Sequence, residues 1–356
     1  MSVLERGAPG AKLLVQGVGM VCSVGMDAAS ASAAVRARIR RFQELPFHDT
    51  QHRPIIGAHV PEATRSVQGF RRCVPLLVRA LEECRARHES WVGAAKKPVP
   101  LLLALAGPER DDLPEDLGAR VLKEVQSQCA EPFGPGSRAF RMGAAGIFHA
   151  LETAAGMLAR HECDACLVAA ADSLVTHKAL HWLELQDRLK TETNSDGVIP
   201  SEAAAALWVT RAKPQTPSLL DILGIGQAEE PSFGKQDVAN LAEGLALALR
   251  RALVDSRLPL GDVDFRVGDV AGERLAFMEA STAFARLLRE PRPSFPLWLP
   301  AEVLGDVGAA LPASMLVLTA VGMAHGDAPG RTALLFASSR GAERAACVVA
   351  APGRSG

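Results

Sequence analysis

The stretch from Gly136 to Ser173 has the arrangement most suited to catalysis. A strand-like run at 138–142 opens directly onto Gly143-Ala144-Ala145-Gly146 and a long small-residue helix that ends near His161. Free N–H groups at such a helix start stabilise anions, and catalytic folds place nucleophiles there. This turn carries only Gly and Ala. The sequence therefore predicts a prepared site that has no reactive side chain, on a helix buried all round.

Other residues whose types could bind a metal or act in catalysis are better explained as structural. Cys163 and Cys166 form a C-x-x-C beside His161, but no fourth ligand or second pair completes a zinc site. A redox pair would precede a helix, whereas this pair enters an apolar strand. Gly17-x-Gly19 lacks the third Gly of a dinucleotide site, and Ser23 lacks the first Gly of a nucleophile elbow. We predict no metal and no cofactor.

Composition narrows the class of protein. The chain has 356 residues, 48% hydrophobic and 22% charged, with a net charge of −1. These values are typical of a globular protein and argue against nucleic acid or a membrane as the main partner. The seven Cys have irregular spacing and mostly lie in apolar runs, so we expect free buried thiols. The N-terminus does not look like a signal peptide, and Ala309–Ala324 is short and holds Pro312. We expect a cytoplasmic protein.

The elements that would position a site alternate between strands and helices in two halves. Lys213 to Pro217 is the best boundary, which gives an N-terminal half at 1–212 and a C-terminal half at 213–356. This alternation predicts layered α/β architecture. In the first half we expect strands at 13–22, 98–106, 138–142, 165–170 and 204–209, an edge segment at 52–60, and helices at 28–41 (capped by Asp27), 70–88, within 111–130, and at 177–189. In the second half we expect strands at 219–225, 263–267, 332–338 and 345–349, and helices at 237–258, 275–288 and 310–323.

The order of several motifs resembles the thiolase superfamily, and within it the β-ketoacyl synthases. The segments are Gly17–Gly25 as an opening strand and turn, Glu162–Asp172 as the strand after the nucleophile helix, Asp196–Ala203, Gly305–Ala310, and a closing hairpin at 333–349. The resemblance covers nearly the whole chain. It implies a five-layer α-β-α-β-α sandwich built from two similar halves, which pair as a homodimer or heterodimer through the strand near 138–142.

The resemblance also implies a nucleophilic Cys at the helix start and two His, or His and Asn, from the second half. Asp164 matches the Asp that follows the nucleophile by 20 residues, which places Ala144 at the Cys position. The two other positions fall on Asp269 and Asp306. A methyl group cannot carry an acyl chain, and carboxylates repel an oxyanion. A carboxylate pair for acid–base work or a cation site is an alternative for these two Asp, but we favour substituted positions that face solvent or pair with Arg.

These substitutions predict a pseudoenzyme. The resemblance leaves Gly143, His149 and Ser201 as a residual pocket, although His149 fits a core histidine better than a catalytic one. Our first hypothesis is a binding protein that acts as an adaptor, co-chaperone or assembly partner, such as for a bacterial type VI secretion effector. The alternative is a chain-length-factor-like subunit that pairs with an active ketosynthase in fatty acid or polyketide synthesis. The least favoured is an enzyme with a relocated nucleophile.

Overall fold

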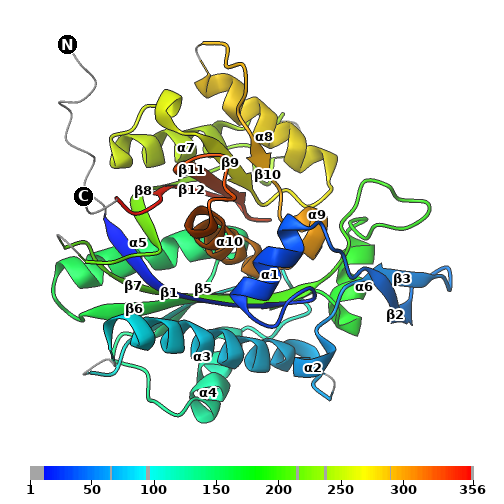
Figure 1. Ribbon diagram of the computed structural model, residues 1–356. Coiled ribbons are helices and arrows are strands. Elements are labelled where there is room, and N and C mark those ends of the chain that lie inside the picture. The colour runs from blue at the N-terminus through cyan, green and yellow to red at the C-terminus, as the bar shows by residue number, and fades with distance from the viewer. Residues whose placement is uncertain are drawn as a thin grey trace.

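The computed structural model describes residues 12–64, 66–93, 97–213, 216–235, 239–288 and 290–353. Figure 1 shows five layers, in which two helical layers enclose two β-layers and further helices lie between the β-layers. The predicted α/β sandwich is therefore confirmed. The first half provides the lower β-layer of the view, and the second half provides the upper one.

Each half builds its β-layer in the same strand order. The first half orders its five strands β5-β4-β6-β7-β1, and the second orders its five β10-β9-β11-β12-β8. Numbered within each half, both orders read 3-2-4-5-1. The first five strands are β1 (Leu13–Cys22), β4 (Leu101–Leu105), β5 (Arg138–Arg141), β6 (Ala165–Ser173) and β7 (Glu202–Arg211). The other five are β8 (Leu220–Glu229), β9 (Phe265–Gly268), β10 (Leu297–Trp298), β11 (Thr332–Ser338) and β12 (Glu343–Ala350).

The two β-layers are joined where β1 pairs antiparallel with β8, at Leu13 with Ile222 and Val15 with Leu220. This pairing makes a single ten-stranded sheet, of which β5 and β10 are the two edges. A separate hairpin of β2 (Gln43–His48) and β3 (Pro54–Gly57) lies beside the main body. The sequence predicted β3 only as an edge segment and gave no strand for β2 or for the two-residue β10.

The helices occupy three layers. The outer layers hold α3 (Cys73–Val92) with α4 (Leu117–Gln128), and α7 (Glu243–Ser256) with α8 (Arg274–Leu287). The central layer holds α5 (Gly146–Ala159) and α10 (Leu311–His325), with α1 (Ala28–Arg36) beside α10. Shorter helices are α2 (Pro61–Thr64), α6 (His177–Leu185) and α9 (Ala301–Leu304). The predicted cap is confirmed, because Asp27 accepts from the N–H of Ser30 in a capping box.

Several predicted helices were too long. α1 ends at Arg36 rather than Arg41, and α6 ends at Leu185 rather than Leu189. α7 begins at Glu243, and the start predicted at Asp237 lies outside the described residues. In each case the overestimated segment is polar or ends in a turn, which amphipathic spacing alone does not detect.

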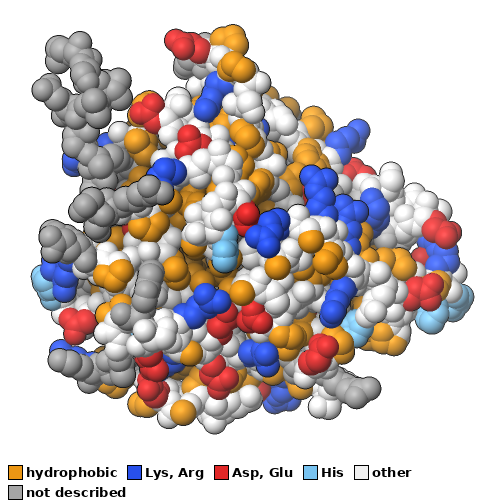
Figure 2. Space-filling model, viewed as in Figure 1, with side chains coloured by type: hydrophobic (Ala, Val, Ile, Leu, Met, Phe, Trp, Pro, Cys, Tyr) orange, Lys and Arg blue, Asp and Glu red, His pale blue; other side chains and the backbone are white. Residues whose placement is uncertain are grey.

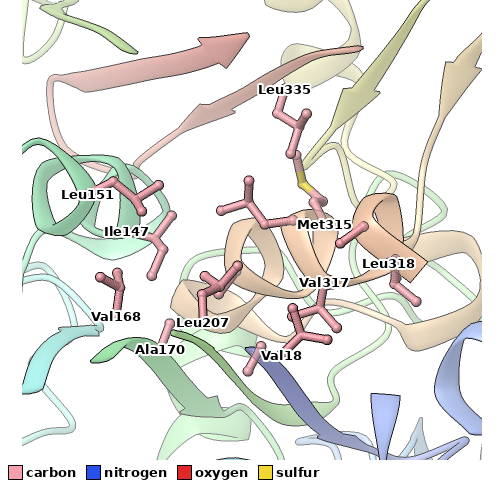
Figure 3. Packing of buried hydrophobic residues seen from close by; sticks show 14 of the residues in the cluster. Val18, Ile147, Leu151, Val168, Ala170, Leu207, Met315, Val317, Leu318 and Leu335 are labelled. Atoms are coloured by element: carbon pink, nitrogen blue, oxygen red, sulfur yellow. The ribbon is translucent and has the colours of Figure 1, made fainter. Parts of the chain in front are cut away.

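The two central helices differ in burial. α10 is buried continuously from Leu311 to Gly322. α5 instead exposes Glu152 and leaves His149 half-buried, so the prediction of burial all round was wrong for α5. Figure 3 shows Ile147 and Leu151 of α5 beside Met315 of α10 in the space between the β-layers. Gly308–His325 is the one described stretch that could cross a membrane by length and composition, and 78% of it is buried in this core.

β1 is buried at every position rather than on alternate residues, because α3 covers one of its faces and the central layer covers the other. A Cβ on Gly19 would lie 2.0 Å from the carbonyl oxygen of Ala80, and one on Gly17 would lie 2.5 Å from that of Cys84. These glycines therefore permit close contact between β1 and α3, and packing accounts for the Gly17-x-Gly19 pattern.

Candidate functional site

One cavity of about 220 Å³ lies where the halves meet, and we call it the charged cavity. Ala144, Asp269 and Asp306 all line it, so the fold brings the three predicted positions together. Gly143 also lines this cavity, but His149 and Ser201 do not. His149 lies half-buried on α5, and Ser201 is fully buried where the chain enters β7. Of the three residues predicted to form a residual pocket, Gly143 alone lines this cavity.

Two similar helix starts converge on the charged cavity. A Gly-Ala-Ala turn of 3₁₀ helix precedes α5 at Gly143–Ala145, and another precedes α10 at Gly308–Ala310. Both glycines adopt the left-handed backbone conformation, with φ of 56° at Gly143 and 54° at Gly308. The two starts repeat each other in the two halves, which the sequence did not reveal because the surrounding residues differ.

Side chains of the protein already accept hydrogen bonds from N–H groups at both helix starts. The N–H of Ala145 donates to Ser339 Oγ at 2.9 Å, and Ser339 Oγ in turn donates to the carbonyl oxygen of Met142. The N–H of Ala309 donates to Asp172 Oδ2 at 3.1 Å. A Cβ on Gly308 would lie 2.1 Å from the same Asp172 oxygen, so glycine is needed for this approach. The N–H groups of Ala145 and Ala309 are thus satisfied by the protein's own side chains.

Asp306 belongs to an ionic network that crosses the cavity. Its Oδ1 accepts from the N–H of Gly308 at 2.8 Å, and its Oδ2 lies 3.5 Å from Arg188. Arg188 also donates to Glu273 at 2.9 and 3.1 Å, and Arg340 donates to the same Glu273. Burial lowers the pKa of Arg188 to about 10. The interpretation of Asp306 as paired with Arg thus agrees with the structure.

Asp269 has a different environment. Its Oδ2 accepts from the N–H of Ser338 at 2.9 Å, and it forms no ion pair with any residue in the described ranges. Burial, together with the charges of Glu279 and Asp306, raises its pKa to about 7. The prediction that Asp269 faces solvent or pairs with Arg was therefore wrong, because the carboxyl group lies inside the cavity beside other acids.

A second buried group of charges forms another part of the wall. Arg110 donates to Asp112 at 2.6 and 2.9 Å and lies 3.4 Å from Asp172. The indole of Trp182 lies within cation–π distance of both Arg110 and Arg188, at 5.0 and 5.3 Å. Glu109 faces the same space, and burial raises its pKa. The wall also has apolar side chains, among them Leu174, Leu245 and Leu311, so charged and apolar groups share the lining.

The sequence missed these cavity residues. Glu109, Arg110, Arg188, Ser339 and Arg340 come from separate loops and strand ends, and no local spacing connects them. The only available signal was the position of each residue directly after a strand or helix, where α/β folds place their sites. That signal does not identify which loops meet.

The arrangement offers carboxylates, guanidinium groups, the Asn240 amide and the hydroxyls of Ser338 and Ser339, but its described lining residues supply no thiol or imidazole. Among the described residues that line the charged cavity there is neither Cys nor His. The Sγ atoms of Cys163 and Cys166 lie 3.4 Å apart at the opposite end of β6, and burial raises the pKa of both thiols. Within the described ranges, no three His, Cys, Asp or Glu side chains group so as to hold a metal ion.

Similar structures identify the fold. The chain has a thiolase-like fold and is structurally similar to β-ketoacyl synthases. No protein-family model matches the sequence, and no curated protein matches it either. A type II polyketide synthase acyl-carrier protein in complex with its ketosynthase bound to the hexaketide gives a TM-score of 0.80 at 12% identity, covering 96% of this chain and 100% of that chain.

Two further similar structures contain chain length factors. The ishigamide ketosynthase/chain length factor gives a TM-score of 0.70 at 18% identity, covering 97% of this chain and 100% of that chain. A ketosynthase in complex with its chain length factor from Xenorhabdus doucetiae gives 0.71 at 11% identity, covering 96% and 98%. At these identities the comparisons establish the fold alone.

Proposed function

We propose that this chain is a non-condensing, ketosynthase-like subunit that pairs with an active β-ketoacyl synthase, as a chain length factor does. One observation carries the proposal: Ala144, Asp269 and Asp306 converge on one cavity that, among its described lining residues, has no Cys or His. Condensation needs a thiolate to hold the acyl group and donors to stabilise an oxyanion. This cavity supplies a methyl group and carboxylates in their place.

The internal hydrogen bonds support the same proposal. Ser339 and Asp172 accept hydrogen bonds from N–H groups at the two helix starts, and Arg188, Glu273 and Arg340 form an ionic network in the wall of the same cavity. An acyl group in this cavity would lie beside buried charges, with no covalent bond to the protein to compensate. Such a cavity stabilises the fold rather than turning over a substrate.

The edge strand β5 is the proposed pairing surface. Within the described chain β5 has a neighbour on one side only, β4, so its other side presents free backbone N–H and C=O groups. The strand directly precedes the helix start at Gly143, and Arg138 on it is exposed. Two of the similar structures join a ketosynthase to a chain length factor, which favours this partner over a secretion effector. The effector adaptor stays a prediction of the sequence.

Affinity purification from the source organism tests the proposal. The tagged chain should co-elute with a ketosynthase that contains the active-site Cys, as mass spectrometry of the eluate would report. Arg138→Glu should weaken the pair by about tenfold, because it reverses a charge at the pairing edge. Arg250→Glu on the outer helix α7 reverses an equally exposed charge and should have no effect. Recovery of the chain alone, or with an effector and no ketosynthase, would refute the proposal.

A further inference from the structure

A second cavity, of about 460 Å³, lies at the opposite end of β6 and β7 from the charged cavity, between these strands and α3. We call it the aromatic cavity. Ala165 at the start of β6 lines it, whereas Asp172 near the end of β6 lines the charged cavity. Seven residues of extended strand separate the two by roughly 23 Å. The thiolase-fold resemblance assigns no role to this second cavity.

Three buried polar atoms behind the wall of the aromatic cavity have no hydrogen-bond partner. They are His88 Nδ1, Trp208 Nε1 and Thr210 Oγ1. The side chains of His88 and Trp208 are 5% and 2% exposed, and their rings stack at 4.1 Å with an interplanar angle of 13°. Buried polar groups are nearly always hydrogen-bonded in folded proteins. The three atoms have almost no accessible surface, so a polar ligand group can bond to one of them only where its side chain can turn toward the cavity.

The chemistry of these atoms defines that group. Trp208 Nε1–H can only donate, and the Thr210 hydroxyl can donate after rotation about χ1, since this side chain is half-buried. The two residues are two positions apart on β7, so both face the α3 side of the sheet. Burial lowers the pKa of His88, which leaves its imidazole neutral. Neutral donors suit a neutral acceptor, such as a carbonyl oxygen, better than a buried charge.

The mouth of the aromatic cavity has a different character. Arg211 and Lys213 are exposed there and form no ion pair with the described part of the chain. The acids beside them are engaged, since Glu162 pairs with Arg160 at 2.6 Å and Asp164 lies 3.9 Å from Lys97. Between mouth and floor the wall is mostly apolar, with Val92, Pro98, Val99, Pro100 and Pro135. The mouth therefore suits an anion, and the middle suits a flat apolar body.

We propose that the aromatic cavity binds a small carboxylic acid with a second, carbonyl oxygen at its far end. The carbonyl oxygen accepts from the Thr210 hydroxyl after it rotates toward the cavity, the apolar body lies between the prolines and valines, and the carboxylate lies beside Arg211 and Lys213. Binding is reversible and involves no covalent step. The proposal is independent of pairing with a ketosynthase, because it rests on the opposite end of the strands.

Isothermal titration calorimetry with three matched aromatic compounds tests this site. Para-acetylbenzoate carries both groups, para-isopropylbenzoate has the same shape without the acceptor, and para-methylacetophenone lacks the carboxylate. We expect saturable binding of para-acetylbenzoate and about tenfold weaker binding of each of the other two, because each leaves one set of protein groups unpaired. No saturable binding of para-acetylbenzoate, or equal affinity for its isopropyl analogue, would overturn the proposal using wild-type protein alone.

Variants then locate the site. Thr210→Val should abolish the preference for the acetyl over the isopropyl compound. Thr319→Val is the matched control, because the Thr319 hydroxyl is also buried without a partner but lies on α10. The double variant Arg211→Gln/Lys213→Gln should weaken both benzoates equally and leave the ketone unaffected. An unchanged acetyl preference in Thr210→Val would place the ligand elsewhere and contradict the assignment.

Discussion

The charged cavity and the aromatic cavity lie at opposite ends of the same strands, and they differ in whether their buried polar atoms have hydrogen-bond partners. In the charged cavity no described lining residue contributes an unpartnered buried side-chain atom, whereas the aromatic cavity has three. In the first cavity Ser and Asp side chains accept hydrogen bonds from N–H groups of the helix starts. At the position where the fold is expected to hold its chemistry, the protein's own side chains therefore satisfy the N–H groups of Ala145 and Ala309, whereas buried polar atoms at the unassigned end have no partner.

On the face shown in Figure 2, hydrophobic side chains are interspersed with basic and acidic ones. The two cavities differ in whether their buried polar groups have hydrogen-bond partners, and substitutions that remove single buried groups test this difference.

The largest effect is expected at Asp172. Asp172→Ala removes the partner of Arg110 and of the Ala309 N–H, leaving both buried with fewer contacts. We expect the free energy of unfolding to fall by about 3–5 kcal/mol, measured by urea denaturation. Asp164→Asn, at a side chain that is 89% exposed, should change it by less than about 0.5 kcal/mol. A cost for Asp172→Ala as small as that of the control would mean that the charged cavity is not held together by these bonds.

Asp269 should make stability depend on pH. Because its pKa in the folded protein is raised to about 7, the folded state favours the protonated form, and stability falls as pH rises from the unfolded value through about 7. Each pKa unit corresponds to about 1.4 kcal/mol, and cavity water offsets part of this. Asp269→Asn should therefore be more stable than wild type by about 2 kcal/mol near pH 8, in urea denaturation.

Near pH 4 the two proteins should unfold at nearly the same urea concentration, because wild-type Asp269 is then protonated in the folded state and about half protonated in the unfolded state. Ser338 keeps an acceptor in the variant, so its N–H stays bonded. A constant difference between the proteins at both pH values would show that Asp269 does not titrate in this range.

The smallest effects compare one hydroxyl from each cavity. Ser339→Ala removes the acceptor of the Ala145 N–H and should cost about 1–2 kcal/mol in thermal or urea unfolding. Thr210→Val removes a hydroxyl that has no partner and should cost less than about 0.5 kcal/mol or stabilise the protein. An equal decrease in the free energy of unfolding for the two variants would contradict the proposed difference between the cavities.

Periodicity and turn chemistry predicted the order of elements, as for β6, α10 and the Asp27 cap, because these depend on residues near in sequence. The sequence did not predict β10 because this strand has two residues, and it did not predict β2 because Pro46 interrupts an exposed segment. The resemblance placed Ala144, Asp269 and Asp306, which the fold then brought to one cavity. The contacts of Arg188 and Ser339 could not be predicted, because they join loops more than 80 residues apart in sequence.

Intact-protein mass spectrometry after incubation with octanoyl-CoA tests the central claim most directly. A cavity that lacks a thiol and an imidazole and has occupied helix-start donors should form no acyl-enzyme. We predict that the mass of the chain stays unchanged while an active ketosynthase treated in parallel gains one octanoyl group. An octanoyl group on this chain, mapped to any residue that lines the charged cavity, would contradict the account.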